Sequence, residues 1–577
     1  MSVRIEAEDI KKLDKNQINV LCDVLRSTIY DTVMECGGHL ASNLGAVEPT
    51  VALCYVFDFP KDKIVFDVGH QCYAYKLLSG RADRFSTLRK KGGLSGFPKR
   101  KESVYDCYDT GHAGTSVSAA IGMAKARDIK NEDHNVIAFI GDGSFNNGLV
   151  YEALNSLRIL DTRILIILND NGMSISPTVG GMHEILSRVN TGGSEIRLLE
   201  NFGLKYMGIK NGNDAEEMID ALTEAKELLK TQSVLLHIVT KKGKGYEFSE
   251  EHPTDTHGVA PVGARKEREY SHILGETLSE MAEKDDKIVA VTAAMTESLG
   301  LEGFFSRFPD RAFDVGICEE NASVLCAAMA ASGLKPYYAI YSTFLQRAFD
   351  EIVHDVCAQD LPVTFCIDRA GISGADGETH QGVFDLSYLT PVPNLTVAVP
   401  KDTEEFHAML QFSANYPHPL AIRYPRSGKV LFEGERKPIK AGEWEYLHRA
   451  TNQKLTVLAT GERSLIIVMK LRQRLSERGM DFSVVNARFV KPLDQKLLAS
   501  LSGDYIVTVE DNVAIGGFGS LVTSFISKLN EKQGRNVKIK TFAYRDEFIP
   551  QGGIAELQSE YGVNCVEIEK YIAECLS

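Results

Sequence analysis

Two polar clusters, each directly after an apolar run, are the residues best suited to chemistry in the first third of the chain. Gly-Asp-Gly at 141–143 follows the run 136–140, and Asn-Asp-Asn at 169–171 follows the run 164–168. A carboxylate, an amide oxygen and a backbone carbonyl are hard oxygen donors that suit Mg²⁺ or Ca²⁺, with ligand phosphate oxygens completing the shell. Either cluster alone would more simply be a turn or a helix cap. Both together, at this spacing, favour a metal and phosphate site.

The elements between the clusters explain how they could meet. Residues 135–141, 144–160 and 163–170 have the pattern of a strand, a helix and a second strand, which is a short βαβ unit. Parallel strands place their carboxyl ends at one edge of a sheet, where open α/β sheets bind ligands. We therefore expect Asp142 and Asn171, 29 positions apart, to be neighbours in space. The flanking glycines let the backbone come close, and the following helix offers N–H groups to an anion.

The rest of the chain repeats this alternation. Runs rich in Val, Ile and Phe alternate with segments of helical periodicity, which is typical of parallel sheets covered by helices. At 577 residues the chain is too long for a single core. We predict an α/β fold of three doubly wound domains with mainly parallel sheets, spanning residues 1–264, 265–432 and 433–577. In the third domain, residues 481–490 are expected to form one strand.

Composition excludes several other classes of protein. A net charge of −14 disfavours a protein that mainly grips nucleic acid, which needs a basic face. The eleven cysteines contain no Cys-x-x-Cys, so neither a zinc ribbon nor a disulfide framework is expected, and a reducing cytoplasm is favoured. No run of 18 apolar residues and no export signal is visible, so we expect no membrane span.

Longer motifs carry a resemblance to a known family. The pair Asp142 and Asn171 resembles the metal-binding signature of thiamine diphosphate enzymes. The segments "GHQCYAYKLLSGR", "NDNGMSIS", "TKKGKGYE", "RYPRSG" and the long run from Tyr341 to Leu389 resemble the 1-deoxy-D-xylulose-5-phosphate synthases, a transketolase-like family. The resemblance covers nearly the whole chain.

This resemblance implies a fold, a reaction and partners. It implies a thiamine diphosphate-binding first domain, a pyrimidine-binding second domain and a transketolase-like C-terminal domain, usually in a homodimer, with the cofactor between the first and second domains of one chain. The family joins pyruvate to D-glyceraldehyde 3-phosphate with loss of CO₂, using thiamine diphosphate and Mg²⁺, and so supplies precursors of isoprenoids, thiamine and pyridoxal. Small-molecule substrates are therefore expected, with neither nucleic acid nor a membrane as partner.

The resemblance also assigns roles by motif match. Metal ligands are expected to be the side chains of Asp142 and Asn171 and the carbonyl of Met173. The expected cofactor contacts are His70, Gly111, His112, Ala113, Gly143, Ser144, Asn171, Met173, Ile317, Glu319 and Phe344. Glu319 is expected to contact the pyrimidine ring and Phe344 to stack on it. The catalytic set comprises Glu319, His39, His70, His257 and His380. The expected substrate contacts are His39, Tyr341, Arg347, Arg369, Asp376, His380 and Arg426, with the arginines suited to a phosphate because of their planar fork.

Three departures from the family pattern leave alternatives open. Cys318, Glu320 and Asn321 surround the catalytic Glu where Ala, Gln and His are usual. Ala113 and Gly114 replace two serines, and the segment 176–241 is shorter than usual. A paralogue that handles another 2-oxo acid or aldehyde, or transfers a ketol group, is therefore one alternative. A cofactor-binding protein without turnover is another.

Overall fold

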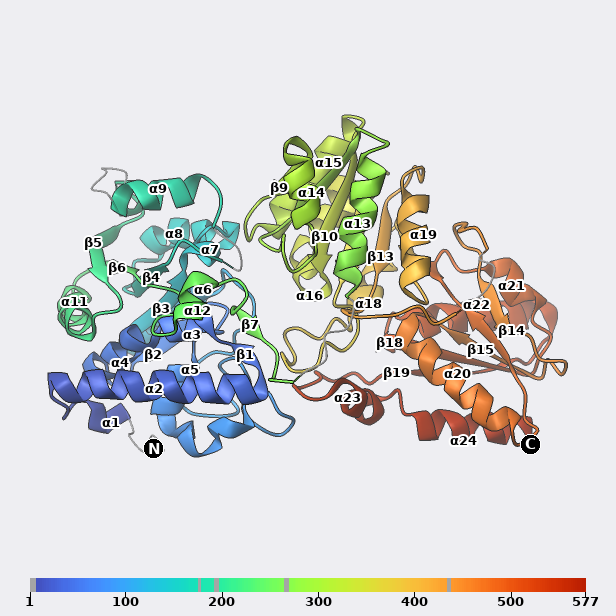
Figure 1. Ribbon diagram of the computed structural model, residues 1–577, viewed down its shortest axis with the longest axis horizontal. Coiled ribbons are helices and arrows are strands. Elements are labelled where there is room, and N and C mark those ends of the chain that lie inside the picture. Colours follow the sequence, from blue (N-terminus) through green and yellow to red (C-terminus); the bar gives the residue numbers. More distant parts are fainter. Residues whose placement is uncertain (1–6, 175–177, 191–196, 264–268, 433–436) are drawn as a thin grey trace. The chain divides into compact units, whose positions relative to one another are not determined.

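The chain folds into two compact units, which we describe from a computed structural model. The first unit comprises Met1–Arg265 with the short segments Gly316–Cys318 and Ala375–Thr379, and the second comprises the remainder. The structure describes residues 7–174, 178–190, 197–263, 269–432 and 437–577 (Figure 1). Both boundaries of the expected three-domain division fall in the gaps between these ranges, so that division stays a prediction.

The first unit is built on a five-stranded sheet in which all neighbouring strands are parallel. Its strands, in spatial order, are β2 (Lys63–Phe66), β3 (Val136–Gly141), β4 (Leu165–Asp170), β6 (Ser233–Val239) and β5 (Leu204–Asn211). Alternate residues of β3 belong to two different cores, because successive side chains of a strand point to opposite faces. Ile137 and Phe139 belong to one core, and Val136, Ala138 and Ile140 to the other.

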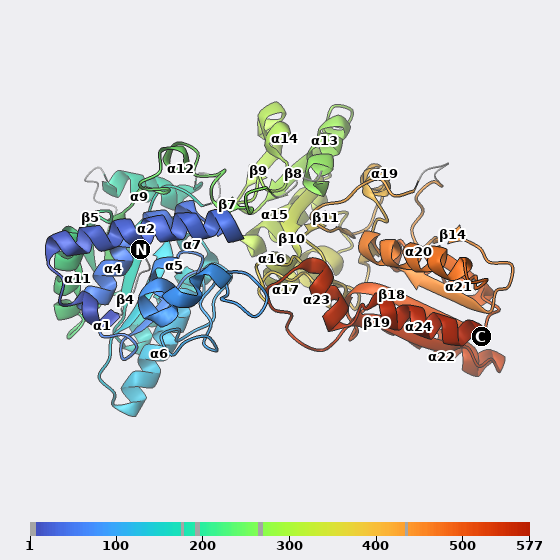
Figure 2. The same ribbon diagram turned by 60° about the horizontal axis from the view of Figure 1, so that its bottom comes forward.

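Helices cover both faces of this sheet, which confirms the doubly wound α/β expectation. One core includes residues of α2 (Lys15–Cys36), α4 (Val47–Val56) and α11 (Ala215–Leu228), and the other includes residues of α6 (Ser116–Lys130) and α8 (Gly148–Leu160). Figure 2 shows α2 and α6 on opposite sides of the sheet. Within the described residues, no helix has the length and apolar character needed to cross a membrane.

The helix expected over residues 144–160 is broken in two. The first piece is α7 (Asp142–Phe145), and α8 begins only at Gly148. Asn147 makes the break, because its side-chain Oδ1 accepts a hydrogen bond from the N–H of Leu149 at 3.1 Å and so caps α8. The break leaves Asp142 at the start of a short turn, directly after β3.

The second unit contains two sheets. The larger has the spatial order β17 (Phe489–Lys491), β12 (Thr396–Ala398), β13 (Leu420–Arg423), β11 (Thr364–Asp368), β10 (Lys335–Tyr341), β8 (Ile288–Thr292) and β9 (Ala312–Asp314). The smaller has the order β14 (Glu445–His448), β16 (Ser483–Asn486), β15 (Leu455–Ala459), β18 (Tyr505–Val513) and β19 (Lys538–Tyr544). Among these described strands, only β17 and β14 run antiparallel to their neighbours.

The expectation of one strand over residues 481–490 is wrong. The chain leaves the smaller sheet after β16 and joins the edge of the larger sheet as β17. The crossing occurs between Ala487 and Arg488. The N–H of Ala487 donates to the carbonyl of Ala459 in the smaller sheet, and the carbonyl of Arg488 accepts from the N–H of Val399, which follows β12 of the larger sheet. The buried guanidinium of Arg488 donates to the carbonyl of Glu443 at 2.9 Å, which fixes the turn between the two sheets.

Candidate active site

The structure brings Asp142 and Asn171 together at one edge of the first sheet. Because β3 and β4 pair in parallel, Gly141 lies opposite Asn169, and both polar clusters follow directly. The N–H of Asn171 lies 3.4 Å from Oδ1 of Asp142, and the hydroxyl of Thr178 donates to Oδ2 at 2.6 Å. Met173 belongs to the same loop, since its N–H donates to Oδ1 of Asn171 at 3.1 Å. All three expected metal ligands therefore lie in one small region.

The charges around Asp142 fit a divalent cation. The side chain is buried, and burial, together with the nearby charge of Asp170, raises its pKa to about 7. In the described part of the chain, no Lys, Arg or His forms an ion pair with this carboxylate. A cavity of about 400 Å³ adjoins Asn171 and Met173, and three lysines lie on its wall: Lys241, Lys242 and Lys244. Oxygen donors beside a basic wall suit a metal ion that carries phosphate groups.

Three side chains that the sequence analysis does not predict, Asp170, Tyr206 and His237, form a hydrogen-bonded group next to this loop. His237 in β6 is fully buried; its Nε2 lies 3.1 Å from Oδ2 of Asp170, and its Nδ1 lies 2.9 Å from the hydroxyl of Tyr206. The other oxygen of Asp170 accepts from the N–H of Gly172 at 3.1 Å. This group therefore fixes the backbone on both sides of Asn171. A lone histidine in an otherwise apolar strand was the only signal for it.

The loop that follows Gly111 departs from the family pattern for a structural reason. Gly114 has φ +84°, and a Cβ there would come within 2.5 Å of Oδ1 of Asn147. Asp67 holds the loop by accepting from the N–H groups of Gly114 at 2.8 Å and Ser116 at 3.0 Å. A serine at position 114 would be strained in this conformation. The absence of its hydroxyl is therefore tied to the position of Asn147.

Other expected cofactor residues of the first unit surround this loop. His112 contacts the carbonyl of Thr379 through Nε2 at 2.8 Å, and the carbonyl of Ile317 accepts from the side chain of Asn147 at 2.9 Å. Gly143 and Ser144 lie in α7, and a Cβ on Gly143 would approach Ser174 to 2.8 Å.

Three of the four expected active-site histidines form a triangle in the first unit. The two-residue strands β1 (Gly38–His39) and β7 (Gly258–Val259) pair antiparallel and bring His39 beside His257. Ring centroids of His39, His70 and His257 lie 5.4 to 5.5 Å apart. Burial, reinforced by Lys242 and the other two histidines, holds the pKa of His257 well below its usual value. His257 is therefore neutral at pH 7 and can accept or donate a hydrogen bond.

Asn43 ties two of these histidines together. Its Nδ2 donates to the carbonyl of His39 at 2.7 Å and to the carbonyl of His70 at 2.6 Å, and its Oδ1 accepts from the N–H of Tyr73. Asn43 is buried, so these bonds are shielded from water. His39 is expected in the active site by motif match, whereas Asn43 has no separate signal in the sequence.

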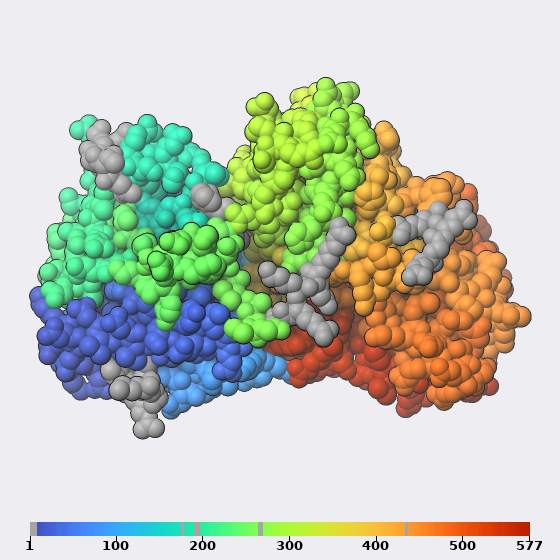
Figure 3. Space-filling model, in the orientation of Figure 1, coloured from blue at the N-terminus to red at the C-terminus, as the bar shows by residue number. Residues whose placement is uncertain are grey.

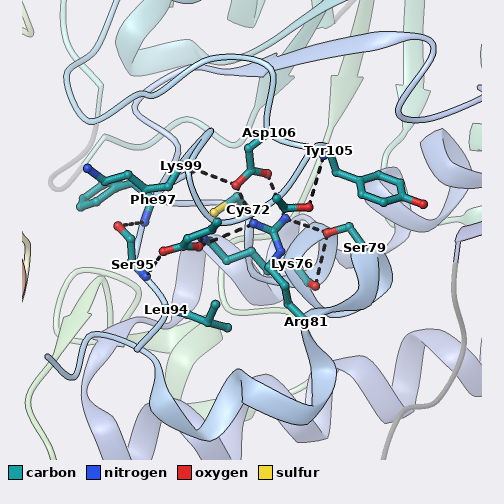
Figure 4. A network of polar contacts seen from close by, with 12 residues as sticks. Cys72, Lys76, Ser79, Arg81, Leu94, Ser95, Phe97, Lys99, Tyr105 and Asp106 are labelled. Carbon is teal, nitrogen blue, oxygen red and sulfur yellow. Dashed lines mark hydrogen bonds and ion pairs between the residues drawn. The ribbon is translucent and has the colours of Figure 1, made fainter. Parts of the chain in front are cut away.

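A buried ionic network anchors the chain between His70 and Gly111 (Figure 4). The fully buried Lys76 donates to Glu102 at 2.6 Å, and the second oxygen of Glu102 accepts from the N–H of Ser95. Arg81 pairs with both oxygens of Asp106, at 2.5 and 2.9 Å. Side chains of the turn after His70 thus hold the loop that leads to Gly111.

Residues 240–259 lie on the surface of the first unit beside α2 (Figure 3). It contains the short helix α12 (Glu247–Glu251). Tyr246, just before α12, stacks on Tyr30 of α2 with ring centroids 4.0 Å apart. This contact fixes the segment that carries the lysines of the cavity wall and His257.

Glu319 begins α15 (Glu319–Ala331) in the second unit, after the carboxyl end of β9. Burial raises its pKa to about 7, opposed by Arg347, whose guanidinium lies 4.0 Å away. Oε2 of Glu319 is buried without a hydrogen-bond partner among the described residues. A buried carboxyl group that is partly protonated at neutral pH can donate a proton or a hydrogen bond to a ring nitrogen, so this site fits the pyrimidine expected there.

Further expected residues gather at the carboxyl ends of neighbouring strands. Phe344 stacks on Tyr341 at the end of β10, with centroids 5.4 Å apart, and meets His380 edge-on at 5.6 Å. Arg369, directly after β11, lies with its guanidinium 4.5 Å from the ring centre of Tyr341. Arg426 follows β13 and approaches Arg369 through a shared partner, Glu269.

The loop that carries His380 is fixed at its base by Gln381. This buried side chain accepts from the N–H groups of Ser373 at 2.6 Å and Gly374 at 3.1 Å, and it donates to the carbonyl of Pro550 at 3.0 Å. Asp376, which is expected near the phosphate end, pairs with Arg89, and both residues belong to the first unit. No motif in the sequence indicates Gln381 or Glu269 as site residues.

Comparison with known proteins identifies the class of enzyme. Family models match three successive segments: 1-deoxy-D-xylulose-5-phosphate synthase over residues 3–196, the transketolase pyrimidine-binding domain over 266–428 and the transketolase C-terminal domain over 442–568. Mainly parallel sheets with these residues at their strand ends define a transketolase-like enzyme that uses thiamine diphosphate and a divalent metal such as Mg²⁺.

Relatives along the whole chain narrow this class to one family. A 1-deoxy-D-xylulose-5-phosphate synthase of Clostridium beijerinckii is 44% identical over 98% of this chain and 98% of its own length. One from Clostridium perfringens is 42% identical over 99% of this chain and 98% of its own. A solved transketolase of Campylobacter jejuni aligns over 97% of this chain and 100% of its own, with 20% identity and a TM-score of 0.46. The chain belongs to the 1-deoxy-D-xylulose-5-phosphate synthase family.

Proposed function

We propose that this protein joins pyruvate to D-glyceraldehyde 3-phosphate, with release of CO₂, to form 1-deoxy-D-xylulose 5-phosphate. The observation that carries the proposal is similarity to synthases of this name over 98% of the chain. Each unit supports it, because the first offers groups for a metal-bound diphosphate and the second offers arginines for a substrate phosphate. The product supplies precursors of isoprenoids, thiamine and pyridoxal.

The cofactor would be held by the residues described above. Asp142, Asn171 and the carbonyl of Met173 would hold Mg²⁺, and the cavity lysines would face the diphosphate. When bound, thiamine diphosphate supplies a carbanion and accepts the electrons released by decarboxylation. Glu319 would hold a proton at its carboxyl group against the pyrimidine ring, for which its pKa of about 7 is suited. Gly111, His112, Ala113, Gly143, Ser144 and Ile317 would line the diphosphate, and Phe344 would stack on the pyrimidine.

The histidines and arginines would select and position the substrates. His257 is kept neutral by burial, so it can accept a proton, and His39 and His70 lie within reach of the same small volume. His380 would contact the substrate beside Phe344. Tyr341, Arg369 and Arg426 would bind the phosphate of the acceptor, and Arg347 would balance the charge of Glu319. We assign Asp376 to the acceptor as well, through its link to Arg89.

Product analysis tests this function directly. Purified protein saturated with thiamine diphosphate and Mg²⁺ should convert pyruvate and D-glyceraldehyde 3-phosphate to a deoxypentulose phosphate detectable by mass spectrometry. CO₂ release from pyruvate with a different acceptor, and none of this product, would indicate a paralogue with another substrate pair. Tight binding of the cofactor in calorimetry without any CO₂ release would indicate a protein that has lost turnover.

We also propose that the enzyme works as a homodimer in the cytoplasm. All eleven cysteines lie in described residues and none forms a disulfide, which suits a reducing compartment. Light scattering after size-exclusion chromatography should give twice the chain mass of 63.6 kDa. A mass of one chain at micromolar concentration would contradict the dimer.

A further inference from the structure

One carboxylate bridges the two arginines that we assign to the acceptor phosphate. Oε1 of Glu269 accepts from Nε of Arg426 at 2.8 Å, and its Oε2 lies 3.5 Å from a terminal nitrogen of Arg369. Each oxygen thus faces a different guanidinium. A phosphate bound by both arginines would place its oxygens against the same two guanidinium groups.

The backbone keeps Glu269 in this place while its side chain stays able to move. Glu269 pairs with Ser427 in an isolated antiparallel bridge, and the N–H of the next residue, Tyr270, donates to the carbonyl of Arg426 at 3.1 Å. The side chain of Glu269 is 22% exposed and that of Arg426 is 62% exposed. The carboxylate can therefore swing into water without unfolding of the segment that carries it.

The carboxylate of Glu269 neutralises positive charge of the arginines that would otherwise attract a phosphate. Arg369 also pairs with the fully buried Asp368 at 2.9 Å, so Asp368 and Glu269 together balance the two arginines. With Glu269 in place the group carries no net charge. With Glu269 displaced it carries one positive charge, beside the ring of Tyr341, and becomes attractive to a phosphate dianion.

We propose that Glu269 is a specificity-determining residue that competes with the phosphate of the acceptor for Arg369 and Arg426. This inference rests on the proposed function and names a residue that regulates the same site. In the free enzyme the carboxylate occupies both arginines, and an acceptor must displace it. Displacement weakens the binding of phosphorylated acceptors and leaves the binding of unphosphorylated aldehydes unaffected, because these make no contact with the arginines.

The test removes the charge and keeps the shape. We compare the wild type with Glu269→Gln, measuring kcat and KM for D-glyceraldehyde 3-phosphate and for D-glyceraldehyde at saturating pyruvate. Because charge-assisted contacts are the stronger ones, KM for the phosphorylated acceptor should fall by about threefold or more. KM for D-glyceraldehyde should stay within about twofold, since it has no charge to compete with the carboxylate. Glu280→Gln, exposed on the helix α13 (Tyr270–Ala282) that begins directly after Glu269, removes one negative charge elsewhere and controls for net charge.

A binding measurement separates this inference from the proposed function. Calorimetric titration with glycerol 3-phosphate reports the arginine pair whether or not turnover occurs, and Glu269→Gln should bind it more tightly than wild type does. An unchanged or raised KM for the phosphorylated acceptor, or unchanged affinity for glycerol 3-phosphate, would show that Glu269 orders the arginines and does not compete with phosphate. Failure of the wild type to form the deoxypentulose phosphate would instead overturn the proposed function, and the calorimetric comparison would still decide the role of Glu269.

Discussion

Asp142 and Glu319 share an unusual property, a buried carboxyl group with a pKa of about 7, but the two residues face different tasks. Asp142 is buried near the charge of a second acid, Asp170, so a divalent cation would stabilise its charged form. Glu319 has one arginine 4.0 Å away, and its Oε2 has no hydrogen-bond partner among the described residues, so its neutral form remains available as a donor. Environment, rather than residue type, thus assigns one carboxyl group to a metal and the other to proton transfer.

The raised pKa of Glu319 makes the cofactor-free protein less stable at alkaline pH. An unfolded Glu titrates near 4.5 and the folded one near 7, so between these values folding takes up a proton and stability falls as pH rises. The full cost above pH 7 is about 3 kcal/mol. Glu319→Gln should therefore melt higher than wild type at pH 8, with the advantage gone at pH 4.5, while losing activity. Calorimetric scans at both pH values measure this, with the half-buried neighbour variant Glu320→Gln as control; equal melting temperatures at pH 8 would contradict it.

Replacement of Asp142 by Asn should separate metal binding from folding. The amide keeps the shape and removes the buried charge, so the cofactor-free variant should fold at least as stably as wild type. Loss of a charged ligand should weaken Mg²⁺ binding by at least the roughly 10- to 100-fold typical for losing an outer-shell partner. Titration of Mg²⁺ in the presence of thiamine diphosphate measures this, and excess of both should restore part of the activity. Asp161→Asn, on the surface after α8, is the matched control; unchanged Mg²⁺ dependence in Asp142→Asn would remove Asp142 from the metal site.

At the scale of elements, a contact between two residues could be predicted where both residues follow strands that are recognisable in the sequence. Asp142 and Asn171 end strands that are visible as apolar runs, so their meeting followed from parallel pairing alone. The approach of His39 to His257 depends on β1 and β7, which have two residues each and leave no periodicity to detect. Their proximity was expected only from the family resemblance. The role of Glu269 was not foreseen for a similar reason, since it arises from one isolated bridge across 158 positions.

The division of residues 481–490 between two sheets could not be predicted from the sequence. Residues 481–490 have the residue types of one strand, yet β16 and β17 belong to different sheets because the backbone groups of Ala487 and Arg488 bond to different neighbours. Hydrophobic alternation indicates burial and cannot indicate which sheet supplies it. A buried arginine within the run was the one sign of an interruption.

The loop from Ser95 to Asp106 depends on its ion pairs for its position, which a double variant can show. Glu102→Gln leaves the fully buried Lys76 charged without its carboxylate, and removal of one partner of a buried pair typically costs about 3–5 kcal/mol. Lys76→Met combined with Glu102→Leu removes both charges and should recover most of that loss. Urea unfolding of the cofactor-free protein measures each variant. A double variant as unstable as the single one would mean that packing, and not charge, holds the loop.

At the scale of the whole molecule, the two sheets of the second unit should behave as one cooperative body. The strand β17 completes the larger sheet although its neighbours in sequence belong to the smaller one. Asp511, at the end of the smaller sheet, binds Arg463 and Tyr544, and its carbonyl accepts from Arg423 of the larger sheet at 3.1 Å. These links run through buried groups, so separating the sheets would expose unpaired charges.

We therefore expect two thermal transitions for the cofactor-free protein, one for each compact unit, and not three. Asp511→Asn removes the buried carboxylate that pairs with Arg463 in the second unit, whereas Arg81→Met leaves Asp106 buried without its partner in the first unit. Each variant should lower one transition by several degrees and leave the other in place, because breaking a buried pair costs about 3–5 kcal/mol only in the unit that contains it. Differential scanning calorimetry of the wild type and both variants measures this. A third transition, shifted by Asp511→Asn and not by Arg81→Met, would contradict this expectation. It would show that the C-terminal sheet unfolds independently, although β17 and the buried bonds of Arg423 connect the two sheets.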